Sequence, residues 1–355
     1  MSRTLHFPRP IHRPVSARVA LGLVVAMVLM SLPALADGPT IDTWPATASS
    51  KLNCFSKSYF EPSGAVPANG FLYVVSDNGQ VGRQTLGQDG CSDGDGSFDS
   101  QHMPGEPDYE SIAFAPSLGN LYIGVEGGDT PARIVELAPP ASTERLKDRR
   151  ADRSLTGWAW TLDLPVSGAN GMEGMTFVPD GHHGLADAGA PFNGLFLAAS
   201  QKEKGKIFFY KLDRPTEKPT QDLTGTRLTD SLGAPLLAEK ISDLYYSEAK
   251  KRLYVLYDEG SSSKKSDCSS AGRWLQVLAL VESGGKKVWT QSALYAPVFD
   301  KKTNAEMHGM EAVAVWGSDL YIGLDQLANQ AVCNNACRDK KCDDWLNPIY
   351  RYTGF

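Results

Sequence analysis

Several features are missing from the sequence, and each absence narrows the possible protein classes. No acidic residue precedes Asp37, and after the apolar run at 19–33 no stretch is long and apolar enough to span a membrane. No run of Lys or Arg occurs, and no long stretch has apolar residues at the spacing of an amphipathic helix. These absences argue against stable membrane insertion, against nucleic acid or anionic membranes as partners, and against a helical fold.

The N-terminus has the pattern of a secretory signal peptide. Basic residues and no acids precede the apolar run, and the small-x-small segment "ALA" at 34–36 follows it. We predict a signal peptide at 1–36 and a periplasmic or secreted mature chain, 37–355. An N-terminal membrane anchor is the alternative, disfavoured because the run is shorter than the roughly 20 residues of a bilayer span. Removing four arginines changes the net charge from −6 to −6 − 4 = −10, which suits metal cations or cationic ligands.

All the cysteines lie in the part of the chain predicted to be exported. An even number in an oxidising compartment favours disulfides, although their pairing cannot be deduced from spacing. A zinc site in "CNNACRDKKC" is the weaker interpretation, because the segment lacks a C-x-x-C pair and a nearby His. The six predicted disulfide cysteines are Cys54, Cys91, Cys268, Cys333, Cys337 and Cys342.

One strand pattern recurs five times along the chain. A leucine-aromatic pair, as in "NGLFLAAS" and "SDLYIGLD", returns at intervals of 49 to 74 residues. An apolar run such as "GMEGMTF" precedes each pair, and another such as "GKIFFYKL" follows it. Short runs rich in aromatic and β-branched residues, bounded by Gly, Asn, Asp and Pro, are typical of strands. About four antiparallel strands per repeat predict an all-β fold, a five-bladed β-propeller forming a single domain over 37–355.

Two alternatives to a five-bladed propeller and one addition to it are consistent with the sequence. A β-sandwich would also be all-β, but it has no reason to repeat one strand pattern five times. A sixth blade could lie within 38–60 or in the long third repeat. The N-terminal segment could add a strand to the last blade and close the ring, which would remove exposed edges.

Acidic residues recur at one position of the repeat. In a propeller the first strand of each blade lines the central channel, and the second strand ends at the face where the first began. Both sets of residues should therefore surround one mouth of the channel. The heads of the first strands are Ser63, Glu110, Glu173, Ser242 (with Asp243 beside it) and Glu311, and the ends of the second strands are Asp77, Glu126, Ser200, Asp258 and Asp325.

Clustered carboxylates need a bound cation or raised pKa values. Hard oxygen donors without convergent His or Cys favour calcium, so we expect Glu110, Glu173, Asp243, Glu311 and Ser63 to form a calcium site. The alternative is that each carboxylate caps a turn or pairs with a loop lysine. Basic residues near the starts of the third strands, Arg133 and Lys206 among them, would pair with the outer acids or hold an anionic group of a substrate.

With these residues in view, the chain resembles the SdiA-regulated (YjiK-like) propellers and the related phytase-like ("esterase-like activity of phytase") group. The resemblance covers most of the mature chain and depends on "EPSGAVPANGFLYVVSDNGQV", "DYESIAF", "GMEGMTF", "ISDLYYSEAKKRLYVLYDEGS" and "GMEAVAVWGSDLYIGLD". It implies a five-bladed propeller with calcium at the channel mouth. The chain departs from the family pattern in three polar inserts, one of which carries His182 and His183. We expect this insert to be a solvated loop; the alternative is that the two histidines bind a metal or act as bases.

Two functions fit this sequence. The first is an exported calcium-binding propeller, expected to be monomeric, whose acidic mouth binds a small molecule or a partner. The second is a calcium-dependent hydrolase of an ester, lactone or phosphoester, with Asp77 or Asp258 as general base. Because no Ser or Cys lies in a recognised catalytic context, any hydrolysis would have to be assisted by the metal.

Overall fold

The computed structural model describes residues 41–46, 48–52, 54–55, 60–77, 79–92, 95–98, 108–127, 130–142, 155–166, 171–229, 232–258, 273–296, 310–324 and 349–355. Several predictions fall outside these residues: the signal peptide at 1–36, Asp325, and the cysteines Cys268, Cys333, Cys337 and Cys342. Within them, no helix has the length and hydropathy of a membrane span.

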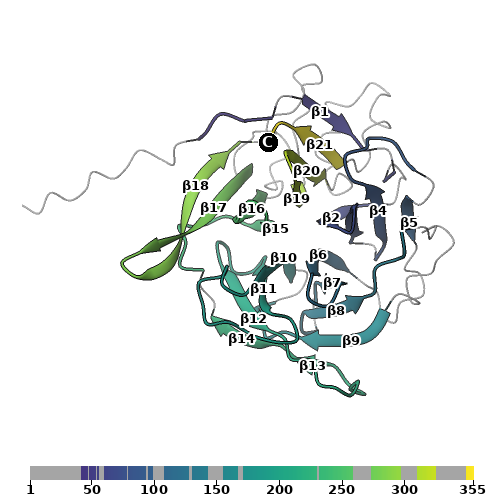
Figure 1. Ribbon diagram of the computed structural model, residues 1–355, viewed down its shortest axis with the longest axis vertical. Coiled ribbons are helices and arrows are strands. Elements are labelled where there is room, and N and C mark those ends of the chain that lie inside the picture. Colours follow the sequence, from purple (N-terminus) through teal and green to yellow (C-terminus); the bar gives the residue numbers. More distant parts are fainter. Residues whose placement is uncertain are drawn as a thin grey trace, which may run out of the picture. The chain divides into compact units, whose positions relative to one another are not determined.

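The described strands form five mainly antiparallel sheets arranged as the blades of a propeller, which confirms the predicted fold class (Figure 1). Each blade is numbered by the place of its innermost strand in the chain. Blade 1 contains β2 (Pro62–Ala68), β3 (Phe71–Ser76), β4 (Val81–Thr85) and β5 (Gly96–Phe98). Blade 2 contains β6 (Tyr109–Ala115), β7 (Asn120–Val125), β8 (Arg133–Leu137) and β9 (Leu155–Thr161), with the short β13 (Leu223–Thr224) added in parallel.

The remaining blades follow the same order from the centre outward. Blade 3 contains β10 (Met172–Pro179), β11 (Gly194–Ser200), β12 (Ile207–Lys211) and β14 (Thr226–Thr229). Blade 4 contains β15 (Ile241–Ser247), β16 (Arg252–Asp258), β17 (Arg273–Ser283) and β18 (Lys286–Tyr295). Blade 5 contains β19 (Met310–Trp316), β20 (Asp319–Leu324), β21 (Ile349–Thr353) and β1 (Ala48–Lys51).

Blade 5 joins the two ends of the described chain. Strand β1 pairs antiparallel with β21, so the N-terminal segment supplies the outermost strand of the last blade, as predicted. This pairing closes the ring between chain segments about 300 residues apart, and no further blade is present among the described residues. The structure therefore supports five blades and not six.

The five inner strands β2, β6, β10, β15 and β19 each pack against the next around the centre, and β19 packs against β2. Two glycines permit the closest approaches. A Cβ on Gly64 would lie 2.6 Å from Cα of Ser111 in β6, and one on Gly174 would lie 2.8 Å from Cα of Asp243 in β15. At these two places the backbones of neighbouring inner strands are in direct contact, so these two positions need glycine.

Cys54 and Cys91 form a disulfide, which confirms one of the predicted bridges. It links the connection between β1 of blade 5 and β2 of blade 1 with the loop between β4 and β5 of blade 1.

Arg351 links blade 5 to blade 1 beside this closure. Its Nε donates to Asp319 Oδ2 at 2.8 Å, and its Nη1 donates to the Gly87 carbonyl at 2.8 Å and to Asp89 Oδ1 at 3.1 Å. Hydrogen bonds to charged groups stabilise more than neutral ones, but partial exposure of Asp89 reduces that contribution.

We expect Arg351→Ala to lower the free energy of unfolding by about 1–2 kcal/mol, seen as a lower midpoint in urea or thermal melts. Arg252→Ala is the matched control, because the recorded contacts of that guanidinium are with the carbonyls of Lys250 and Lys251 in its own turn. Equal midpoints for the two variants would show that the link across the closure contributes nothing measurable.

Candidate functional site

A β-bulge occurs at the same place in every inner strand. In each blade the inner strand pairs with the second strand, and the pairing skips one residue of the inner strand immediately after the first residue pair. A bulge leaves its extra residue out of the ladder and redirects its side chain. The skipped residues are Ser63, Glu110, Glu173, Ser242 and Glu311. These are the five strand heads predicted from the repeat, and the bulge is the local feature that sets them apart from the sheet.

Three carboxylates gather at the head of blade 2. Asp108 stands one residue before β6, Glu110 is the bulged residue of β6, and Glu126 follows β7 directly. Each can offer an oxygen such that the three atoms lie within 4.8 Å of one another. Glu126 is buried, and its Oε1 accepts the N–H of Gly171 at 2.9 Å. No lysine or arginine of the described segments forms an ion pair with any of the three.

The negative charges of this group and its neighbours raise one another's pKa values. Burial, followed by the charges of Glu173, Glu311 and Asp108, holds the pKa of Glu110 well above its ordinary value. Burial and the adjacent Asp108 raise the pKa of Glu126 to about 8, although the N–H of Gly171 opposes the shift. The carboxylates of blades 2, 3 and 5 are therefore close enough to interact, and we name Asp108, Glu110, Glu126, Glu173 and Glu311 the acidic cluster.

Lys240 brings a positive charge into the acidic cluster. Its Nζ lies 3.2 Å from Glu173 Oε2, and both side chains are largely buried. Burial alone would lower the pKa of this ammonium, but Glu173, Glu311 and Glu110 raise it above the ordinary value. Burial still leaves the pKa of Glu173 raised, against the opposing effect of Lys240.

Asp243 is engaged by the backbone of three blades. It lies in β15 and is only 1 % exposed. Its Oδ1 accepts the N–H of Leu244 at 2.8 Å, its Oδ2 accepts the N–H of Val313 in β19 at 2.7 Å, and the N–H of Ala65 in β2 also donates to it. Burial raises its pKa well above the ordinary value, and these donors oppose the shift. The structure thus gives this predicted calcium ligand another set of partners.

The outer acids also contact backbone. Asp258 Oδ2 accepts the N–H of Met310 at the start of β19 at 2.7 Å, and Arg273 Nε lies 3.7 Å from Asp258 Oδ1. Asp77 is half-buried at the end of β3, and its N–H donates to the Glu61 carbonyl. The hydroxyl of Ser63 donates to the same carbonyl at 3.1 Å. Asp258, like Glu126, therefore fastens the end of its second strand to the first strand of the next blade.

The two predicted basic residues pair with exposed acids of nearby loops. Arg133 Nε lies 2.7 Å from Asp222 Oδ2, and Lys206 Nζ lies 2.7 Å from Glu203 Oε2. Neither pair includes a member of the acidic cluster. Partly exposed pairs of this kind contribute little to stability.

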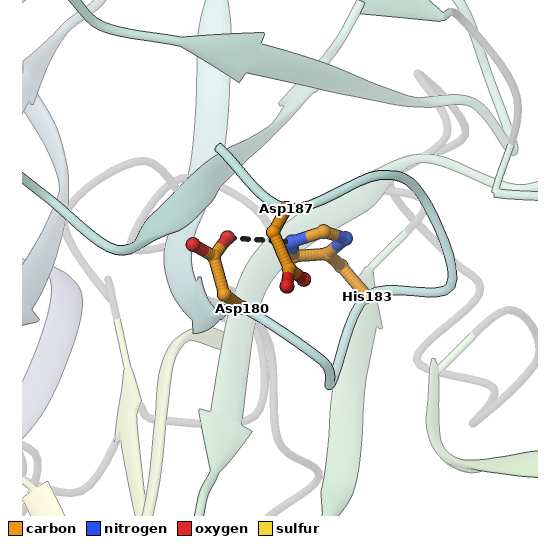
Figure 2. A group of neighbouring side chains, drawn as sticks. All are labelled: Asp180, His183 and Asp187. Carbon is orange, nitrogen blue, oxygen red and sulfur yellow. Dashed lines mark hydrogen bonds and ion pairs between the residues drawn. The ribbon is translucent and has the colours of Figure 1, made fainter. Parts of the chain in front are cut away.

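A second group of possible metal ligands lies in the loop between β10 and β11, at the opposite end of β10 from Glu173. Figure 2 shows Asp180, His183 and Asp187 facing one another. His183 was expected in a solvated loop, but its side chain is buried. Its Nε2 lies 3.1 Å from Asp180 Oδ1. Because its Nδ1 accepts the N–H of Leu185, the proton of the neutral ring is on Nε2, where a metal would have to bind.

The two aspartates of this loop are also occupied. Asp180 accepts the N–H groups of Ala188 and Gly189, and Asp187 accepts that of Gly181. These bonds and His183 lower the pKa of Asp180, although its burial opposes the shift. The group therefore folds the loop on itself, and it does not have the arrangement of a metal site.

One segment, residues 90–94, has the letters of the G-x-S-x-G motif. Its Ser92 is exposed between β4 and β5, where the hydroxyl donates to Gln88 Oε1 at 2.7 Å. The motif functions on a sharp turn from a strand into a helix. This serine lies between two strands, so the structure gives it no catalytic context.

Two residues of the site, Asp108 and Lys240, were not predicted from the sequence. Both stand one residue before an inner strand, at equivalent positions of the repeat. Glu61 holds the same position before β2, and Gly171 holds it before β10. Extending the repeat alignment by two residues before the strand heads would have placed these charges at one position of the repeat.

No protein-family model matches the chain, and no curated protein sequence is similar to it. Among solved structures, a proposed oxidoreductase (glucose dehydrogenase) from Thermus thermophilus is similar over 86% of this chain and 99% of its own, at 13% identity and a TM-score of 0.40.

Two further solved structures show a similar degree of likeness. The β-propeller domain of Cps50 (Swd1) from Myceliophthora thermophila matches 78% of this chain and 82% of its own, at 11% identity and a TM-score of 0.38. Hydrazine synthase from Kuenenia stuttgartiensis matches 75% of this chain and 56% of its own, at 11% identity and a TM-score of 0.33. At this level of similarity none of them indicates a function for the chain.

Proposed function

We propose that the acidic cluster binds a calcium ion, and that the face carrying it binds a small molecule or a partner. The observation that carries the proposal is the convergence of Asp108, Glu110 and Glu126, whose oxygens lie within 4.8 Å of one another. Carboxylates at this spacing, one of them buried and two partly buried, repel one another unless protons or a cation neutralise them. A set of oxygen donors without nitrogen or sulfur fits a hard cation, and calcium tolerates irregular geometry better than magnesium.

The donors also come from rigid elements. Glu110 projects from a bulge in an inner strand, and Glu126 is held by the N–H of Gly171. The remaining oxygens of these two residues and of Asp108 would supply the protein ligands, and the rest of the coordination would come from water or a bound ligand. An exported propeller of the SdiA-regulated or phytase-like type would fit this site. A purely binding role is favoured over hydrolysis because Asp258, one expected general base, already contacts the Met310 N–H and Arg273.

Thermal melts with calcium and with EDTA test this proposal. At a calcium concentration about 100 times Kd, binding adds about 2.7 kcal/mol to the free energy of unfolding, which corresponds to a shift in the melting temperature of about 4 °C for a domain of this size. We expect Glu110→Gln to lose most of that shift, because a neutral amide replaces one charged ligand.

Glu203→Gln is the control, since that carboxylate pairs with Lys206 outside the cluster. Wild-type melts that coincide in EDTA and in millimolar calcium would refute calcium binding. If calcium raised the melting temperature of Glu110→Gln as much as that of wild type, the calcium would bind elsewhere.

A further inference from the structure

Lys240 lies where blade 4 differs from its neighbours. In blades 2, 3 and 5 the bulged residue of the inner strand is a glutamate, but in blade 4 it is Ser242. Lys240 stands two residues before this serine and extends its ammonium to Glu173 of blade 3. Blade 4, which like blade 1 has a serine at the bulge, thus contributes a cation to the same cluster.

The ammonium lies on one side of the acidic cluster. It is 3.2 Å from Glu173 Oε2, and its charge also interacts with Glu311 of blade 5. These two glutamates belong to the blades on either side of blade 4. Asp108, Glu110 and Glu126 all belong to blade 2, where no described lysine or arginine pairs with them. The charge of Lys240 also acts on Glu110, but its direct ion pair is with Glu173, so the carboxylates of blade 2 have no ion pair with a described lysine or arginine.

Ser242, the bulged residue of β15, has an unused hydroxyl at the repeat position that Glu173 and Glu311 hold in blades 3 and 5. The residue is 1 % exposed, and its hydroxyl has no hydrogen-bond partner in the described part of the chain. A buried hydroxyl without a partner is costly unless something else satisfies it. Ser242, Glu173 and Glu311 are equivalent bulged residues of adjacent blades, and their oxygens are of the kind that a hard cation requires.

We propose that the Lys240 ammonium occupies a second cation position, framed by Glu173, Glu311 and Ser242, and thereby limits the acidic cluster to one bound divalent cation. The inference rests on the proposed function for the position of that cation, at Asp108, Glu110 and Glu126. The ammonium is part of the chain and carries a single positive charge, so it neutralises Glu173 and takes the place that a second calcium ion would occupy. Removing it leaves a buried carboxylate uncompensated, and the protein then recruits a second divalent ion.

Titration calorimetry with calcium chloride on the full mature chain tests the proposal, in wild type, Lys240→Gln and Lys240→Arg. Glutamine keeps a hydrogen-bond donor toward Glu173 but removes the charge, whereas arginine keeps the charge. We expect one calcium per chain in wild type and in Lys240→Arg, and two in Lys240→Gln. Adding Ser242→Ala to Lys240→Gln should weaken the second site at least several-fold and leave the first unchanged.

The outcomes separate this proposal from the proposed function. No calcium in wild type but one in Lys240→Gln would refute the proposed function and support the role of Lys240. One calcium in both proteins with the same affinity would refute the role of Lys240 and leave the proposed function standing. No calcium in either protein, or two in wild type, would refute the role of Lys240.

Loss of folding in Lys240→Gln is also informative. Far-ultraviolet circular dichroism and melts with and without calcium show whether the variant folds. If it folds only when calcium is added, a divalent ion has replaced the ammonium, as proposed. If it stays unfolded at every calcium concentration while Lys240→Arg folds, no cation enters the position and the proposal is wrong.

Discussion

Asp243→Ala is expected to destabilise the propeller more than any other single change at its centre. The carboxylate accepts N–H groups from β15, β19 and β2, so its removal leaves three buried donors without an acceptor. Each such donor costs about 1–3 kcal/mol, and the side chain lies where the inner strands converge. A loss of about 3–5 kcal/mol, a large part of the stability of a typical domain, is the expected result.

Urea unfolding at pH 7 followed by tryptophan fluorescence measures this loss. Asp243→Asn keeps one acceptor oxygen and should fall between wild type and Asp243→Ala. Asp187→Ala is the matched control, because that exposed carboxylate accepts the N–H of Gly181 within a surface loop. If Asp243→Ala unfolds at the same urea concentration as this control, the carboxylate does not hold the three blades together.

The repeat in the sequence was enough to predict the propeller, because each blade has the same alternation of strands and turns. The leucine-aromatic pairs lie in β3, β7, β11, β16 and β20, the second strands of the five blades. The predicted strand heads coincide with the bulged residues, since both follow from one position of the repeat. Periodicity therefore carries information about which residues share a position in the fold.

The partners of those residues could not be predicted in the same way. Arg133 pairs with Asp222, which is 89 residues away in an irregular segment, and no period relates the two. Asp243 stands beside a bulged residue, and only the packing of three blades shows that its oxygens face backbone donors. His183 is buried because its loop folds on itself through Asp180, although its sequence surroundings are polar. Contacts of this kind depend on tertiary geometry and loop conformation.

The binding of a cation to the acidic cluster is expected to depend strongly on pH. Glu126 has a pKa of about 8 in the folded chain because burial and the neighbouring Asp108 disfavour its charged form. The pKa of an exposed glutamate in the unfolded chain is much lower, so the folded protein holds the proton more tightly. In the absence of metal, this proton stabilises the fold at low pH, and the stabilisation is lost as the pH rises through about 8.

Metal-free melts should therefore show lower stability at pH 9 than at pH 6, with a slope of up to about 1.4 kcal/mol per pH unit for one proton. The affinity for calcium should change with pH in the opposite direction to the stability of the metal-free protein. A bound cation must displace the proton, so affinity should rise about tenfold per pH unit from pH 6 to 8 and level off above it. Calcium should accordingly stabilise the protein most at the pH where the metal-free chain is weakest.

Calcium titrations at pH 6, 7, 8 and 9 measure this dependence, and Glu126→Gln is the variant that isolates its source. The glutamine oxygen can still accept the N–H of Gly171, but the amide carries no proton that calcium would release. We expect Glu126→Gln to bind calcium more weakly at pH 8 and to lose most of the pH dependence. A wild-type Kd that stays constant over this range would mean that the cation does not displace a proton from Glu126, and it would move the binding site away from blade 2.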